Sequence, residues 1–127
     1  MPRFNMPFEL GMFFAAKRFG SPQQRKKIAL ILDSRAYRYR ASLSDISGQD
    51  IEVHGRVQKR AIRQIRDWLN TCHQGSNSPP GGEFINKQYR EFSRQLPNAS
   101  KKKNLNASEL NYADICRAME SWLKDNG

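Results

Sequence analysis

The stretch Ile28-Ala29-Leu30-Ile31-Leu32-Asp33 decides the expected fold of this chain. Five consecutive apolar residues end at an aspartate and follow a polar, basic segment at residues 21–27, which we interpret as a linker. An apolar run of this length between polar segments favours a strand that is buried on both faces, as in a parallel sheet. A second, shorter strand is predicted at Asp50 to His54, where apolar and polar residues alternate.

Helices are predicted around these strands. The first runs from about Pro7 to Phe19, because apolar residues recur at helical spacing and Gly20 follows. Its apolar side chains cover a wide arc, so we expect an exposed apolar patch and a tendency to self-associate. A short helix is expected near Arg40 to Ile46. A long helix is expected from Gly55 to about His73, with an apolar stripe of Val57, Ala61, Ile65, Trp68 and Leu69.

The chain is expected to have two parts. Residues 75–82 contain Gly, Ser, Asn and paired prolines and form the predicted linker between a partial α/β domain at residues 1–74 and a helical segment at residues 83–127. In that segment, helices at Phe84 to Leu96 and Ser108 to Lys124 flank a basic loop, Lys101-Lys102-Lys103. The fold class is therefore α/β, a partial parallel sheet of two strands resembling the C-terminal portion of a flavodoxin-like fold, with a C-terminal helical extension.

Length and charge narrow the classes of function. The 127 residues include 22 Lys+Arg against 12 Asp+Glu, and the net charge of +10 is concentrated in residues 1–80. We expect an anionic partner, either a nucleotide or weakly bound, non-specific nucleic acid. Because two strands alone do not make a stable layered sheet, we also expect a second copy of the chain, a partner chain, or a larger parent domain.

Several classes are disfavoured. No stretch approaches the ~18 apolar residues of a membrane span, so we expect no membrane partner. Asn5 and Glu9 interrupt the approach to a short signal-like apolar run, which indicates a folded helix and a cytoplasmic protein. The cysteines, Cys72 and Cys116, are expected to be reduced, and no metal-binding pattern or cofactor is predicted.

The segment Phe8-Glu9-Leu10-Gly11 resembles the F-E-L-G or F-E-I-G signature of TIR-like and nucleoside 2-deoxyribosyltransferase-like domains. The resemblance, over about residues 3–70, implies that Glu9 is a catalytic residue in N-glycosidic bond cleavage, with NAD or another nucleotide as substrate. It also implies a role in bacterial signalling or defence. In that family the first strands and the phosphate- and ribose-binding loops precede the glutamate, whereas eight residues do so here. The resemblance therefore implies a chain that lacks the N-terminal portion of its domain, and we expect the 127 residues alone to be inactive.

The candidate nucleotide-site residues each allow two interpretations. A carboxylate at Glu9 could stabilise or attack a ribosyl oxocarbenium ion, or could complement the dipole of its own helix. Asn5 could bind ribose or cap the helix. Asp33 lies at the carboxyl end of a predicted parallel strand, where α/β proteins bind ligands, or it could simply end the strand in a turn. Phosphate binding and base stacking are one interpretation of Arg35, Tyr37 and Arg38. The other is that these residues belong to a solvated loop.

The alternative function is a non-catalytic, basic module that binds nucleic acid or another protein. Its candidate nucleic-acid-binding residues are basic and lie in three segments: Arg40, Lys59, Arg60, Arg63, Lys101, Lys102 and Lys103. The same residues could form solvated helix faces, and no helix-turn-helix, RNP or KH signature accompanies them.

Overall fold

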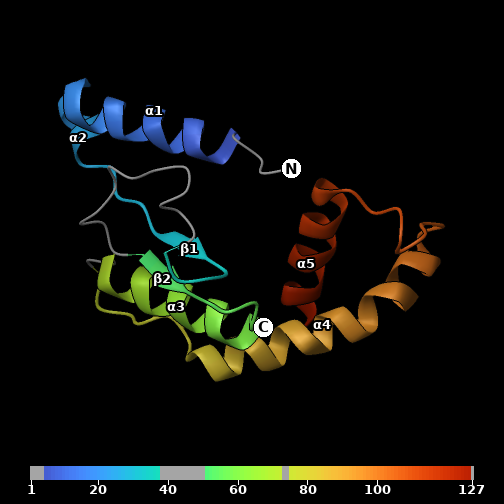
Figure 1. The fold of residues 1–127 in the computed structure, drawn as a ribbon. Coiled ribbons are helices and arrows are strands. Elements are labelled where there is room, and N and C mark those ends of the chain that lie inside the picture. Colours follow the sequence, from blue (N-terminus) through green and yellow to red (C-terminus); the bar gives the residue numbers. More distant parts are fainter. Residues whose placement is uncertain (1–4, 38–50, 73–74, 127) are drawn as a thin grey trace. The chain divides into compact units, whose positions relative to one another are not determined.

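A computed structural model of the chain describes residues 5–37, 51–72 and 75–126, with side chains from residue 7 onward (Figure 1). The chain divides into two compact units, Met1–Ser76 and Asn77–Gly127. It is mostly helical with one small parallel sheet, and its described elements in order are α1 (Asn5–Phe19), α2 (Pro22–Arg25), β1 (Ile31–Asp33), β2 (Ile51–Val53), α3 (Gln58–Cys72), α4 (Gly82–Lys102) and α5 (Tyr112–Asn126). The short helix expected near residues 40–46 lies outside the described residues. None of the described helices combines the length and apolarity needed to cross a membrane.

The two strands pair in parallel, as the sequence predicts. Ile31 lies opposite Ile51 and Asp33 opposite Val53. This confirms an α/β architecture with a two-stranded parallel sheet, whereas the likeness to a flavodoxin-like fold stays a prediction. The expected extent of the first strand was wrong, because residues 28–30 precede it and Ile28 is exposed. A strand is buried on both faces only where other elements cover both faces, and Ile31 and Leu32 are only half-buried here.

The segment between α1 and β1 also differs from the expected linker. Gly20 ends α1 as predicted, and its N–H donates to Ala16 O at 2.8 Å. The chain then forms the short helix α2, in which Ser21 is the N-cap and Pro22 occupies the first turn. The Ser21 Oγ accepts the Gln24 N–H at 3.4 Å. A capping serine followed by proline is a helix-start signal, which outweighs the polar character of this segment.

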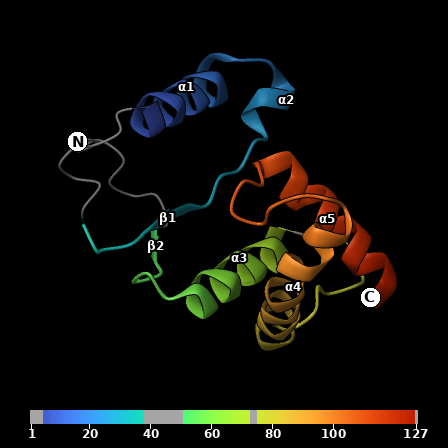
Figure 2. The same ribbon diagram turned by 90° about the vertical axis from the view of Figure 1, so that its right-hand side faces the viewer.

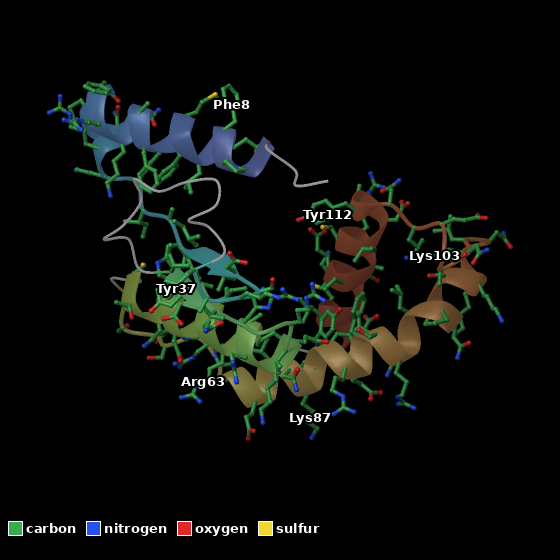
Figure 3. All side chains as sticks on the ribbon, viewed as in Figure 1. Phe8, Tyr37, Arg63, Lys87, Lys103 and Tyr112 are labelled. Carbon is green, nitrogen blue, oxygen red and sulfur yellow. The ribbon has the colours of Figure 1, made fainter. Side chains whose placement is uncertain are left out.

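Apolar side chains in residues 1–76 are poorly covered. Phe8, Met12 and Phe19 are all exposed on α1, which confirms the expected apolar exposure there (Figure 3, in which Phe8 is labelled). Among the described residues of this unit, no hydrophobic side chain is buried. Large exposed apolar surfaces are typical of proteins that bind a partner or self-associate. Self-association of this chain stays a prediction.

In the second unit, the loop over residues 103–111 joins α4 to α5 (Figure 2). The buried aromatic side chains of the described chain meet here. Phe92 and Trp122 are 4% and 9% exposed, and their rings make an edge-to-face contact with centroids 6.0 Å apart. Trp122 Nε1 also donates a hydrogen bond to Gln95 Oε1 at 2.9 Å. The end of α5 is thus fixed against the middle of α4.

The expected end of α4 at Leu96 was wrong, because the helix continues through Pro97 to Lys102. Lys101 and Lys102 therefore lie in the helix rather than in a loop. Pro97 cannot donate to the Ser93 carbonyl, but Ser93 is exposed and that carbonyl can be hydrated. The helix ends in a Schellman motif, in which Asn104 has φ 55° and the Leu105 N–H donates to Ser100 O at 2.9 Å.

The expected start of α5 at Ser108 was also wrong, since the helix begins at Tyr112. Asn111 and Asp114 explain this boundary by capping each other. The Asp114 N–H donates to Asn111 Oδ1 at 3.0 Å, and the Asn111 N–H donates to Asp114 Oδ2 at 3.2 Å. This reciprocal pair is a capping box, with asparagine and aspartate in place of the usual serine and glutamate.

Candidate nucleic-acid interface

Helix α3 carries a basic surface in the first unit. It contains Lys59, Arg60, Arg63 and Arg66 against a single acidic residue, Asp67. The turn before it includes Gly55 and Arg56 with φ of 60°, which delays the start of the helix to Gln58, beyond the predicted Gly55. The excess of basic side chains gives this helix a net positive charge.

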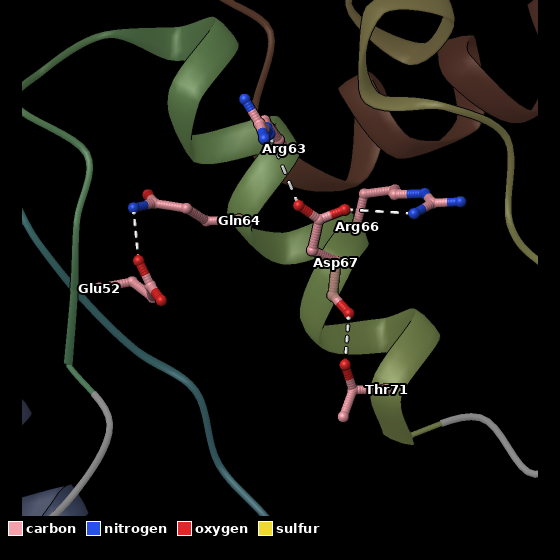
Figure 4. A network of polar contacts seen from close by, with 6 residues as sticks. All are labelled: Glu52, Arg63, Gln64, Arg66, Asp67 and Thr71. Atoms are coloured by element: carbon pink, nitrogen blue, oxygen red, sulfur yellow. Dashed lines mark hydrogen bonds and ion pairs between the residues drawn. The ribbon is translucent and has the colours of Figure 1, made fainter.

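Two arginines of α3, Arg63 and Arg66, form ion pairs with Asp67 on the same helix. Arg63 projects from α3 with its side chain 79% exposed, and its Nε lies 3.6 Å from Asp67 Oδ2 (Figures 3 and 4). Arg66 Nη1 lies 3.2 Å from Asp67 Oδ1 (Figure 4). One carboxylate thus pairs with two guanidinium groups, which leaves a positive excess. Exposed ion pairs of this kind contribute little to the stability of a protein. The arginines can therefore exchange the Asp67 carboxylate for another anion at little cost.

A cavity of about 600 Å³ lies between α3 and the sheet. Its α3 side comprises residues spaced three or four apart, which places them along one side of the helix. The sheet side contributes Leu30 and the two residues that begin β2. The full lining is Leu30, Ile51, Glu52, Arg60, Arg63, Gln64, Asp67, Trp68 and Thr71. The cavity therefore combines two guanidinium groups, a half-buried indole and several hydrogen-bond acceptors.

Gln64 connects α3 to the sheet. Its Nε2 donates to Glu52 Oε2 at 2.8 Å (Figure 4). The same Nε2 also donates to Val53 O at 3.2 Å. Its Oε1 is buried and has no hydrogen-bond partner among the described residues. An unsatisfied buried acceptor costs free energy, and native structures contain few of them. Because this oxygen has almost no accessible surface, it is enclosed by protein atoms and does not face the cavity.

Among the predicted nucleotide-site residues whose side chains the structure describes, none lines this cavity. Helix α1 begins at Asn5, two residues before the predicted start, and the side chain of Asn5 lies outside the described part. Glu9 is exposed on α1 beyond its first turn, so the interpretation that it complements the dipole at the start of its helix was wrong. Asp33 is buried, and its Oδ1 accepts the N–H groups of Ser34 at 2.6 Å and Arg35 at 3.4 Å. Asp33 therefore ends β1 in a turn, which was one of its two interpretations.

The remaining predicted residues are dispersed. Arg35 and Tyr37 are exposed after β1, and Tyr37 has φ 59° (Figure 3). Arg38 and Arg40 lie outside the described residues. The predicted nucleic-acid set falls into both units, with Lys59, Arg60 and Arg63 on α3 and Lys101, Lys102 and Lys103 at the end of α4. Of the members of this set that the structure describes, Arg60 and Arg63 line the cavity.

Several cavity residues were not predicted as site residues. Trp68 was assigned to the apolar stripe of its helix, and Gln64, Glu52 and Thr71 carried no assignment. The spacing of Arg60, Gln64, Trp68 and Thr71, which is four, four and three residues, is the sequence signal that could have found them. Comparisons with protein families, with curated proteins and with solved structures find no match to this chain.

Proposed function

We propose that residues 1–76 bind nucleic acid through the basic surface of α3. The observation that carries this proposal is the position of Arg60 and Arg63, which are exposed and also line the cavity that contains Trp68. Guanidinium groups bind phosphate oxygens with charge-assisted hydrogen bonds, and an indole offers a face for base stacking. The net charge of +10 favours association with a polyanion at a distance.

The proposal predicts a strong dependence of affinity on salt. Each phosphate that a lysine or arginine neutralises releases counterions, so log K falls by about 0.7 per contact for each unit of log[salt] on single strands. With two to four contacts, we expect a slope of about −1.4 to −2.8. Fluorescence anisotropy of a labelled oligonucleotide over a salt series measures it. An affinity that is equal at low and physiological salt would show that the binding is not electrostatic and would overturn the proposal.

A second candidate function is N-glycosidic bond cleavage at Glu9. The parallel pairing of β1 and β2 favours it, because Asp33 then ends β1 at the carboxyl edge of the sheet, where α/β proteins bind ligands. The resemblance of Phe8-Glu9-Leu10-Gly11 to the TIR-like and deoxyribosyltransferase-like signature supplies the reaction. In this proposal the Glu9 carboxylate stabilises the positive charge that develops on the ribose as the glycosidic bond breaks.

Replacement of Glu9 by glutamine separates a catalytic role from that of an exposed surface residue. If Glu9 is catalytic, the variant should lose nearly all base release from NAD or a deoxynucleoside and keep its fold, because an amide cannot stabilise the oxocarbenium ion. If Glu9 is only an exposed residue beyond the first turn of α1, the variant should change the stability by less than about 0.5 kcal/mol and leave base release unchanged. The assay uses a chain extended upstream of Met1, with Glu109→Gln as an isosteric control. An active extended chain whose turnover survives Glu9→Gln would make the catalytic assignment wrong.

A further inference from the structure

We propose that α1 lies on the surface of an anionic lipid bilayer, with its exposed apolar side chains among the acyl chains and the basic groups at its carboxyl end against the headgroups. The inference goes beyond the proposed function and uses a different segment of the chain. Two observations carry it: an uncovered row of large apolar side chains, and a cluster of basic residues at the end of the same helix.

The apolar row on α1, called the α1 stripe below, consists of Phe8, Met12, Ala15 and Phe19. Their spacing of four, three and four residues places them on one side of the helix. Phe8, Met12 and Phe19 are 68%, 56% and 77% exposed, and Phe8 projects outward from the helix (Figure 3). At 1.5 Å per residue the stripe is about 16 Å long. Because exposure of so much apolar surface to water is unfavourable, the stripe calls for a partner that is itself apolar.

Basic side chains gather where α1 ends. The Arg18 guanidinium lies over the Phe19 ring, 5.5 Å from the ring centroid, so a positive charge adjoins the α1 stripe. Arg25 on α2 reaches back to the same end, where its Nε donates to Gly20 O at 3.2 Å. Residues 5–27 contain one acidic residue and five basic residues, which are Lys17, Arg18, Arg25, Lys26 and Lys27. A partner for this end of α1 should therefore be negatively charged.

An anionic bilayer matches both features. Apolar side chains of an interfacial helix enter the boundary between headgroups and acyl chains to a depth of about 5–10 Å, and anionic headgroups attract lysine and arginine. A second copy of the chain matches only the apolar feature, because the same segment offers one carboxylate, Glu9, for five basic residues. A nucleic-acid duplex matches only the charge. The expectation of no membrane partner rested on the lack of a spanning segment, which a helix in the plane of the interface does not need.

Co-sedimentation with vesicles measures the binding. We expect the chain to bind mixed phosphatidylserine–phosphatidylcholine vesicles more than about tenfold more tightly than vesicles of phosphatidylcholine alone. Phe8→Gln/Phe19→Gln should bind the mixed vesicles about a hundredfold more weakly, since each buried phenylalanine contributes a factor of about ten or more. The control Phe84→Gln/Tyr112→Gln removes aromatic side chains that are 55% and 84% exposed on the second unit, and should lose less than about threefold.

A fluorescent label distinguishes insertion of α1 from adsorption by charge alone. Met12→Cys in a Cys72→Ser/Cys116→Ser chain carries nitrobenzoxadiazole, whose emission shifts to the blue in an apolar environment. Circular dichroism checks that each variant keeps its fold. We expect the blue shift on the mixed vesicles, and no shift when the label is attached at Ser93→Cys, an exposed position on α4.

The outcomes decide which partner covers the α1 stripe. No binding to the mixed vesicles, binding without a blue shift, or equally strong binding by Phe8→Gln/Phe19→Gln would overturn the inference. If light scattering shows that this variant turns a dimer into a monomer and it still binds the vesicles, a second copy covers the stripe. Arg60 and Arg63 are kept in every variant, so nucleic-acid binding through α3 is tested separately and stands or fails on its own result.

Discussion

The double variant Arg60→Glu/Arg63→Glu is expected to bind nucleic acid about a hundredfold more weakly than the wild-type chain at low salt. Each reversal replaces an attraction to phosphate by a repulsion, and a unit charge pair at 4 Å is worth about 1 kcal/mol even in bulk water. Two reversals therefore cost about 4 kcal/mol before screening, and partial screening by salt reduces this to about 2.7 kcal/mol, which corresponds to a hundredfold loss. Because two phosphate contacts are lost, the magnitude of the salt slope on single strands should also fall by about 1.4.

A matched control separates the α3 site from net charge. Arg94→Glu/Arg117→Glu changes the charge by the same amount on the second unit. The two arginine side chains are 73% and 75% exposed, comparable with the 79% of Arg63, and each pairs with a carboxylate on its own helix. We expect the control to lose less than tenfold in affinity. Equal losses in both double variants would mean that the chain binds through its total charge, and that α3 is not the interface.

The sequence predicted the parallel sheet but not its extent. The apolar run before Asp33 and the long connection to Ile51 are enough to specify two parallel strands, since parallel pairing requires a crossover. The number of residues in each strand depends on what covers it, and that is a tertiary property. The predicted helix boundaries near Pro97 and Asn111 were wrong for a different reason. Local hydrogen bonds and hydration determine where a helix begins or ends, and the spacing of apolar residues does not reveal them.

The sequence predicted the charged residues of the candidate site but not its other residues. Arg60 and Arg63 stand out in any sequence because they are charged and clustered. Trp68 follows the apolar periodicity of α3, and that pattern alone cannot tell a core residue from the wall of an open cavity. The sheet contacts α3 through Gln64, beside the stripe of Ile65 and Leu69, which remain partly exposed. Packing determines which side of an amphipathic helix contacts a two-stranded sheet. The sequence alone did not show which side of α3 this would be.

The second large effect concerns the stability of residues 77–127. Trp122→Ala is expected to cost about 3–5 kcal/mol of unfolding free energy, the usual range for truncating a buried aromatic side chain. The variant loses the edge-to-face contact with Phe92 and leaves Gln95 Oε1 without the indole N–H that it accepts. Stability of about 0.05–0.15 kcal/mol per residue gives this unit only about 3–8 kcal/mol in total. The loss should therefore unfold most of this unit.

Urea denaturation followed by far-UV circular dichroism measures the effect in the full chain. Tyr112→Ala is the control, because this aromatic side chain begins the same helix but is 84% exposed, and its loss should cost less than about 0.5 kcal/mol. Trp122→Phe should fall between the two, since it keeps a ring against Phe92 and loses only the hydrogen bond to Gln95. If Trp122→Ala unfolds no more easily than Tyr112→Ala, the contact between Phe92 and Trp122 does not hold α5 to α4, and another interaction must join the two helices.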